Sequence, residues 1–198
     1  MELGLRERKK QATRRRIAAA AAELFAEEGF EQVPVARVAR AAEVSEATVF
    51  NYFPTKEDLV HDGMSDFASA VLDAVRDRPE GTSVLTAFRA AAVQPSGLTD
   101  EGVARIAAVA RVIAASPALR ARERLVYDGY TRGLAALLAS SSDVVPWVTA
   151  NALVGVNRAL QRLVHEMALA GRSAEEITAA VVAQGEAAFD LLARGLAG

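Results

Sequence analysis

Side chains that can form hydrogen bonds gather on one face of a short segment, residues 45–52. Val49 and Phe53 are four residues apart, so a helix over this segment would bury both on its inner face. The outward face then carries Glu46, Thr48, Asn51 and Tyr52. Hydroxyl, amide and carboxylate groups of this kind can meet phosphate oxygens and base edges. Asn51 is the best candidate base reader, because its amide can pair bidentately with adenine. Water or phosphate is the alternative partner of Asn51. A glutamate at the position of Glu46 more often solvates a helix N-terminus than it reads a base.

A second short helix must come just before this segment to hold it at an angle. Val38, Ala39 and Ala42 place small apolar groups on one side of that helix, and Val44 fills the turn between the two. The Ser45 side chain can cap the exposed N–H groups of the following helix. Two short helices around a tight turn, with polar groups outward on the second, predict a helix-turn-helix reader of double-stranded DNA.

Charge is unevenly distributed along the chain. Its 198 residues carry a formal net charge of −2, which would argue against nucleic acid if it were evenly spread. The N-terminus nevertheless holds a basic arm, composed of Arg6, Arg8, Lys9, Lys10, Arg14, Arg15 and Arg16. A local basic arm can attract phosphate while the rest of the molecule stays acidic. We therefore expect Arg14 and Arg15 to contact DNA; the alternative is a solvated start of a helix.

Several classes of protein are excluded by what the sequence lacks. There is no cysteine, and neither His61 nor His165 has a partner at a metal-ligand spacing, so we expect no disulfide, thiolate or metal site. No nucleophile with a base and no phosphate-binding glycine loop is visible, so we expect neither an enzyme nor a cofactor. Without a charge-free run of bilayer length or an apolar signal segment, we expect a cytoplasmic protein with no membrane partner.

The whole chain is predicted to be α-helical. Alanine is abundant, and proline and glycine fall between the periodic stretches. The buried stripe of a first helix includes Ile17, Ala21 and Phe25, and Gly29 can end it. Thr55 and Asp58 form a capping-box-like start for a fourth helix, and further helices are predicted near 84–93, 100–115 and 117–139. Asp143 or a nearby serine should begin the next helix, which Gly171 stops. Ser173 and Glu176 cap the last helix.

The first sixty residues resemble the DNA-binding domain of the TetR family of bacterial transcriptional regulators. The resemblance rests on TRRRI, LFAEEGFE, ARVARAAEVS and TVFNYFPTKEDLV, which occur in family order and at family spacing. It implies an all-α homodimer with a three-helix N-terminal DNA-binding domain at 1–55. A helical effector-binding and dimerisation domain would follow at 56–198, with repression relieved when a small molecule binds. The stretch 116–122, SPALRAR, resembles a branch thought to accept acyl-CoA-like ligands, so the expected effector is small and hydrophobic or acyl-type.

The resemblance assigns DNA-binding roles to particular residues. Ser45, Thr48, Tyr52 and Lys56 match family positions that touch phosphates. Two positions depart from the family pattern. Glu43 stands where glycine is usual, which costs roughly 1 kcal/mol if the backbone there is left-handed. Phe50, also on the DNA-binding helix, replaces a commoner tyrosine and so lacks one hydroxyl that would point to phosphate.

The C-terminal helices are expected to enclose an effector and to pair two subunits. Candidate ligand-binding residues, taken from the inward stripes, are Phe67, Phe88, Ile106, Val109, Tyr130 and Asn157. Candidate dimer-interface residues on the final two helices are Leu153, Leu160, Ile177, Val181, Gln184 and Ala188. The alternative for these stripes is that they only cover the subunit's own core. The alternative function is a DNA-binding regulator without an effector, either constitutive or controlled by a protein partner.

Overall fold

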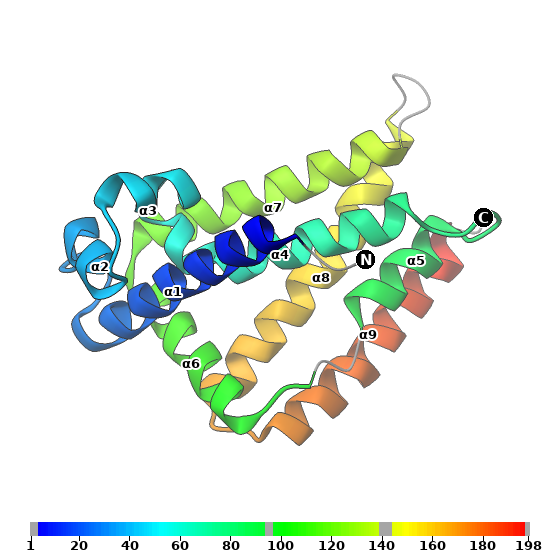
Figure 1. Ribbon diagram of the computed structural model, residues 1–198. Helices are drawn as coiled ribbons and strands as arrows, with labels where there is room; N and C mark the ends of the chain where they lie inside the picture. The colour runs from blue at the N-terminus through cyan, green and yellow to red at the C-terminus, as the bar shows by residue number, and fades with distance from the viewer. Residues whose placement is uncertain (1–3, 94–96, 139–143, 197–198) are drawn as a thin grey trace. The chain divides into compact units, whose positions relative to one another are not determined.

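The computed structural model describes residues 4–93, 97–138 and 144–196 of the chain. Within these ranges every regular element is an α-helix, which confirms the predicted all-α class (Figure 1). The helices, in chain order, are α1 (Leu5–Glu28), α2 (Val35–Ala41), α3 (Glu46–Tyr52), α4 (Asp58–Arg76), α5 (Val84–Ala92), α6 (Asp100–Ala115), α7 (Pro117–Leu138), α8 (Val145–Leu169) and α9 (Ala174–Leu196).

Contacts divide the chain into two compact units. Unit 1 comprises residues 1–63 and 108–123, and unit 2 comprises residues 64–107 and 124–198. The division falls within α4, α6 and α7 rather than at a loop. The expected functional boundary between residues 55 and 56 stays a prediction.

The core of unit 1 is built around the apolar stripe of α1. Ile17, Ala21 and Phe25 are buried, together with residues of α2 and α3 and with Ile113 and Leu119 from the second segment of the unit. Gly29 ends α1 with a positive φ of 86°, and its N–H donates to the carbonyl of Phe25. This confirms the predicted end of the first helix, because glycine takes up this backbone conformation without steric cost.

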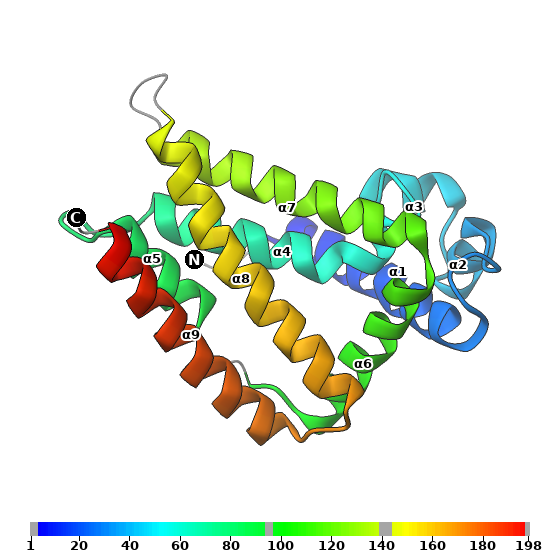
Figure 2. The ribbon, with the colours of Figure 1, turned by 180° about the vertical axis from the view of Figure 1, so that it is seen from behind.

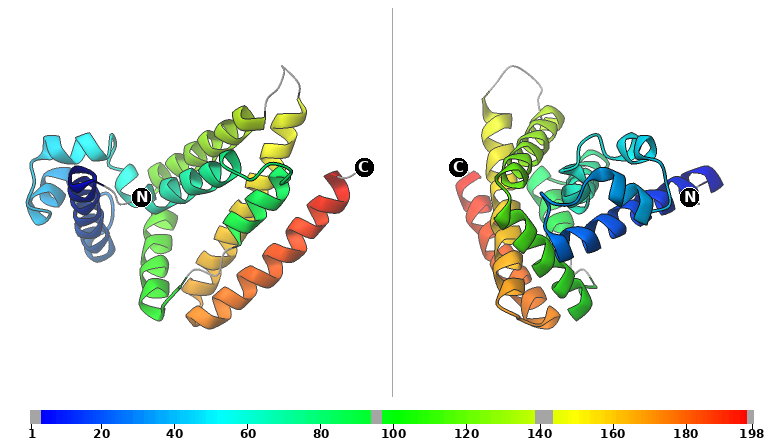
Figure 3. Two further views of the ribbon diagram at one scale, coloured as in Figure 1. Left: turned by 45° about the vertical axis from the view of Figure 1, so that its right-hand side comes forward. Right: turned by 90° about the vertical axis from the view of Figure 1, so that its left-hand side faces the viewer.

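Unit 2 is centred on the long helices α8 and α9, which run side by side (Figure 2). Helix α5 lies along α9 (Figure 3). The main apolar cluster of unit 2 joins α4, α5, α7, α8 and α9. It includes the aromatic rings of Phe88, Tyr130 and Phe189. A second cluster joins the first half of α6 to α8 and α9 through Val103, Ala168, Ile177 and their neighbours.

Local hydrogen bonds set several helix ends of this unit. Ser173 and Glu176 form the predicted capping box: the Ser173 N–H donates to the Glu176 carboxylate at 2.9 Å, and the Glu176 N–H donates to Ser173 Oγ at 3.2 Å. Gly171, with φ of 71°, follows the end of α8 as predicted. The expected cap at Asp143 or a nearby serine lies outside the described residues.

The burial of α8 and α9 within one subunit bears on the predicted dimer interface, which stays a prediction. Leu153 and Ile177 are at most 1% exposed and Leu160 is 6% exposed, because the apolar clusters of their own subunit cover them. Val181 and Ala188 are half-buried, and only Gln184 of the six candidates is exposed. For Leu153, Leu160 and Ile177 this burial favours the alternative interpretation, in which the stripe covers the subunit's own core.

No single helix in the described ranges is long and apolar enough to cross a membrane. Helices α6 and α7 meet the length and composition requirement only as a pair, which is bent by 108° at the break between them.

Candidate nucleic-acid interface

Helices α2 and α3 form the predicted helix-turn-helix in unit 1. Val38 and Ala39 of α2, Ala42 of the turn, and Val49 with Phe53 at the end of α3 are all buried, with exposed fractions of 0–3%. The small side chains of Ala39 and Ala42 let the two helices pack closely. Val49 and Phe53, which are four residues apart, fix the inner face of α3. The opposite face of α3 is thereby turned to solvent.

The turn between the two helices has the hydrogen bonds of a Schellman motif. The Glu43 N–H donates to the carbonyl of Arg40 at 3.1 Å, and the Val44 N–H donates to the carbonyl of Ala39 at 2.9 Å. This motif requires a left-handed residue, and Glu43 takes that role with φ of 52°, alone among the described non-glycine residues. The departure from glycine at this position therefore carries the conformational cost expected of it.

Ser45 is the N-cap of α3. Its Oγ accepts a hydrogen bond from the Thr48 N–H at 3.1 Å and lies 2.8 Å from the Thr48 hydroxyl. The predicted cap is confirmed, and it fixes the direction in which α3 begins. Both hydroxyls lie at the N-terminal end of the helix, where backbone N–H groups and the helix dipole favour an anion such as phosphate.

The outward face of α3 is open to solvent. Glu46 and Asn51 are exposed, Phe50 is 46% exposed, and Tyr52 is half-buried. In the part of the chain that the structure describes, the Asn51 amide has no hydrogen-bond partner. Its two donors and its acceptor are therefore available to an external group.

Lys56 is held in an aromatic niche at the start of the segment leading into α4. Its ammonium donates to the backbone carbonyl of Phe30 and lies 4.3 Å from the centre of the Phe30 ring and 5.7 Å from that of Phe25. Burial lowers the pKa of Lys56 below its usual value of 10.5, against the opposing effect of Glu31 and Glu57. No local pattern predicted this niche, because Phe30 lies 26 residues before Lys56 in the chain.

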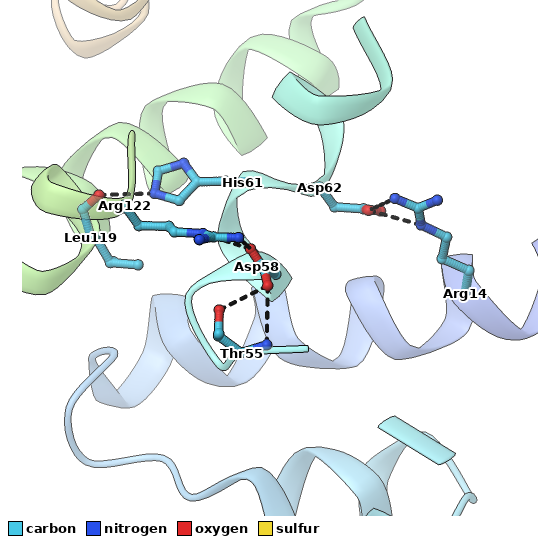
Figure 4. A network of polar contacts seen from close by, with 7 residues as sticks. All are labelled: Arg14, Thr55, Asp58, His61, Asp62, Leu119 and Arg122. Atoms are coloured by element: carbon cyan, nitrogen blue, oxygen red, sulfur yellow. Dashed lines mark hydrogen bonds and ion pairs between the residues drawn. The ribbon is translucent and has the colours of Figure 1, made fainter. Parts of the chain in front are cut away.

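The basic arm contributes side chains in two different states. Arg14 donates to the Asp62 carboxylate through both Nε and Nη2, and its guanidinium lies 5.7 Å from the centre of the Phe53 ring (Figure 4). Arg15 and Arg16 are exposed. The structure therefore uses Arg14 to tie α1 to α4, while Arg15 is open to a partner.

The first turns of α4 are fixed by polar contacts that join distant parts of unit 1 (Figure 4). The Asp58 carboxylate accepts from the Thr55 N–H at 3.0 Å and from the Thr55 hydroxyl at 2.8 Å, as the capping pattern predicted. The same carboxylate accepts from Arg122 at 2.8 Å.

His61 is 2% exposed, and its Nε2 lies 3.0 Å from the carbonyl of Leu119. The ring nitrogen must carry the proton to donate there. Burial lowers the pKa of His61 below 6.5, despite the hydrogen bond to Leu119 and the nearby carboxylates of Glu123 and Asp58. Neither this contact nor the one from Arg122 had a local sequence signal.

The candidate effector residues do not form a single group. Phe88 and Tyr130 stack in the main cluster of unit 2 with ring centres 6.0 Å apart, and Phe67 packs against the same cluster. Asn157 is buried on α8. Ile106 belongs to the second cluster of unit 2, and Val109 belongs to unit 1.

The structure offers no metal centre within its described ranges, where no group of three or more histidine, cysteine or acidic side chains is suitably placed.

Comparisons with known proteins agree with this geometry. Residues 17–62 match the model of the family described as bacterial regulatory proteins, tetR family. The transcriptional regulator TcmR of Streptomyces glaucescens is 38% identical over 88 residues, which cover 44% of this chain and 39% of that protein. The transcriptional regulator MftR of Mycobacterium tuberculosis is 28% identical over 194 residues, or 96% of this chain and 93% of that protein.

Among solved structures, the fatty acid degradation regulator FadR of Bacillus halodurans has a TM-score of 0.55 and 21% identity, with 96% of this chain and 97% of that chain covered. At this identity the likeness concerns the fold, and it extends over both units.

Proposed function

We propose that this chain, which belongs to the TetR family of bacterial regulatory proteins and is a DNA-binding transcriptional regulator, acts as a homodimeric repressor that a small effector releases from a palindromic operator. The observation that carries the DNA-binding part is the outward face of α3. Buried apolar residues fix its backbone, whereas Asn51 and its neighbours are exposed. This is the division of labour that a recognition helix needs.

On DNA, we assign base reading to Asn51 and phosphate contacts to Ser45, Thr48, Tyr52 and Lys56. The two hydroxyls at the start of α3 are 2.8 Å apart, so they can share one phosphate at the helix N-terminus. From the basic arm, Arg15 contributes a direct phosphate contact. Arg14 acts mainly by holding α1 against α4, because its guanidinium is already bound to Asp62.

Buried polar groups in unit 2 support an effector site. The Tyr130 hydroxyl is buried and has no hydrogen-bond partner among the described residues, and burial raises the pKa of Tyr130. Asn157, on α8, is a second polar residue of this unit that is buried, at 3% exposed. An unpaired buried polar group costs about 1–3 kcal/mol. A ligand that hydrogen-bonds to Tyr130 and Asn157 and places its apolar part against Phe67 and Phe88 would recover that cost, which favours a hydrophobic or amphipathic effector.

Exposed small residues on α8 and α9 support the dimer. On α9 the stripe Ala179, Ala183, Ala187 and Leu191 recurs every four residues and is exposed, with Leu191 at 64%. On α8, Gly155 and Ala159 are exposed as well. Small side chains permit close approach of helices, so two copies can pair these faces as a four-helix bundle across a two-fold axis. Regulators of this family typically dimerise.

The dimer is tested by placing a charge within the exposed stripe. Ala187→Glu should yield a helical monomer with weak operator binding, because the charge would be buried in the bundle. Ala90→Glu, at an exposed position on α5, is the matched control and should remain dimeric. If Ala187→Glu sedimented as a dimer, as the parent protein is expected to do, the interface would lie elsewhere.

The central experiment is in vitro selection of DNA sites with the purified protein. We expect an inverted repeat whose half-sites are spaced by about one helical turn, ~34 Å, or a multiple of it. Enrichment of a single asymmetric site, or of no site, would refute the dimeric operator reader. Adding fatty acids and acyl-CoA compounds to the purified complex then tests release, and persistence of the complex with every one of them would refute an acyl-type effector.

A further inference from the structure

Unit 1, the unit that carries α2 and α3, contains an apolar cleft. Its volume is about 180 Å³, and α1, α4 and the second half of α6 form its walls. All the residues that line it belong to unit 1, namely Ala18, Ala22, Phe25, Ala26, Leu59, Val60, Asp62, Gly63, Ala108, Val109 and Val112. The cleft is thus separate from the buried polar groups Tyr130 and Asn157 of unit 2.

Small residues leave this space unfilled. Ala18, Ala22 and Ala26 are spaced by four residues and form one stripe of α1, and Gly63 in α4 contributes no side chain. A Cβ atom added to Gly63 would meet no other atom within 4 Å. By contrast, a Cβ at Gly133 or Gly185 would come within 3.0 Å or less of a side chain of Leu72 or Val93, so packing explains those glycines.

The backbone does not require a glycine at position 63 either. Gly63 lies within α4, and its φ is not among the positive values found in the described part of the chain. A helical glycine destabilises a helix relative to alanine. Its effect here is to extend the open space toward α4.

The chemistry of the walls restricts what the cleft can hold. All lining residues except Asp62 are apolar, and the Asp62 carboxylate already accepts two hydrogen bonds from Arg14. The paired carboxylate leaves no net charge for a ligand to neutralise. An enclosed apolar cavity of about 150 Å³ is large enough for benzene, and this cleft, which is open to solvent at Ala22, Ala26 and Gly63, has a similar volume. The cleft is therefore suited to a neutral ligand with one ring.

We propose that this cleft binds a small neutral apolar molecule the size of one substituted aromatic ring. This is a second ligand site, independent of the effector site proposed in unit 2, and it is built into the unit that carries α3. A ligand in the cleft would contact α6 and also α1, which is the helix that carries the basic arm. By mass action it would stabilise unit 1 in proportion to its occupancy.

The test uses toluene as the probe and the full-length protein labelled with carbon-13 at leucine and valine methyl groups. Methyl signals of the wall residues Leu59, Val60, Val109 and Val112 should shift and saturate as toluene is added. Those of Val71 and Leu134, in the core of unit 2, should not. Absence of saturable shifts up to the solubility of toluene, or equal shifts in unit 2, would overturn the proposal.

Variants that fill the cleft from opposite walls locate the site. Ala22→Leu and Ala108→Leu should each weaken toluene binding by about tenfold or more, which is a change of about 1.4 kcal/mol. Ala19→Leu and Ala114→Leu, at exposed positions of the same two helices outside the cleft, are the matched controls and should bind as the parent does. Circular dichroism verifies folding, and either filling variant suffices if the other is unfolded.

Unchanged toluene binding in both filling variants would refute the assignment. Tyr130→Phe should leave toluene binding intact, so failure of the effector site in unit 2 and failure of this cleft are distinguishable.

Discussion

Replacing Glu43 by glycine is expected to stabilise the protein. Glu43 has a φ of 52°, and a left-handed residue other than glycine costs about 1–2 kcal/mol. Glycine would remove that cost but would add conformational entropy to the unfolded chain, worth about 0.4–1 kcal/mol. The two backbone hydrogen bonds of the Schellman motif do not depend on the side chain. The Glu43 side chain is exposed, and within the described ranges it makes no ion pair or hydrogen bond.

The net gain in the free energy of unfolding is therefore about 0.5–1 kcal/mol. For a chain of this length, that gain corresponds to a rise of about 1–4 °C in Tm. Urea unfolding followed by circular dichroism, with the midpoint and the slope determined separately, measures it.

Two variants separate backbone strain from other effects. Glu43→Gln removes the negative charge but keeps the left-handed strain, so its stability should stay within about 0.5 kcal/mol of the parent. Ala41→Gly, at an exposed helical position two residues earlier, should be destabilising by about 0.5–1 kcal/mol. If Glu43→Gly lost stability as Ala41→Gly does, the left-handed turn would carry no strain and the reasoning would be wrong.

The other predictions concern the DNA-binding face, the effector site and the buried histidine. Asn51→Ala should relax sequence preference at one operator position at a cost of about 1–3 kcal/mol, and an unchanged selection profile would contradict this. Without effector, Tyr130→Phe should raise the free energy of unfolding by about 1 kcal/mol, because it removes an unpaired buried hydroxyl. The same variant should weaken the release of DNA by effector. Tyr127→Phe, at another buried tyrosine, is the control, and equal effects in the two variants would contradict the role of Tyr130. Because burial lowers the pKa of His61, the folded state takes up its proton less readily than the unfolded state. The contribution of neutral His61 to stability should therefore be fully present above pH 6.5 and should be lost as the pH falls below that value. The urea midpoint should drop between pH 7.5 and pH 5.5, and the drop should be smaller in His61→Gln.

Local patterns predicted the helix ends well. The cap at Ser45, the capping box of Ser173 with Glu176, and the stop at Gly29 all depend on hydrogen bonds between residues three or four apart. Such contacts are specified by the residue types themselves, so they can be inferred without knowing the tertiary structure. The helix-turn-helix belongs to the same class, because its two helices are adjacent in the chain.

Contacts between distant residues could not be predicted in this way. Arg122 reaches Asp58 across 64 positions, and no local pattern connects the two. The dimer prediction shows a related limit. An apolar stripe shows which side of a helix avoids water, but not whether the same subunit or a second copy covers it. Leu153 and Leu160 are covered by their own subunit, which leaves pairing to the exposed alanines of the opposite faces.

Lys56 shows how a residue assigned to phosphate can also have a structural role. One N–H of its ammonium is directed to the Phe30 carbonyl, and an ammonium has three donors. The remaining donors can reach a phosphate, and the niche of Phe25 and Phe30 holds the side chain in place before DNA arrives. A preorganised side chain loses less entropy on binding than a free one.

This dual role leads to an expectation that separates the two contributions. Lys56→Met keeps most of the apolar stem in the niche but loses the charge. It should weaken binding about equally on all sequences and lower the slope of log affinity against log salt by roughly one unit. It should also reduce stability, but by less than the roughly 1.5–3 kcal/mol of a charged hydrogen bond, because the desolvation that lowers the pKa of Lys56 is relieved when the ammonium is removed. A loss of stability with an unchanged salt slope would mean that the ammonium serves the niche alone and that the phosphate contact belongs to another residue.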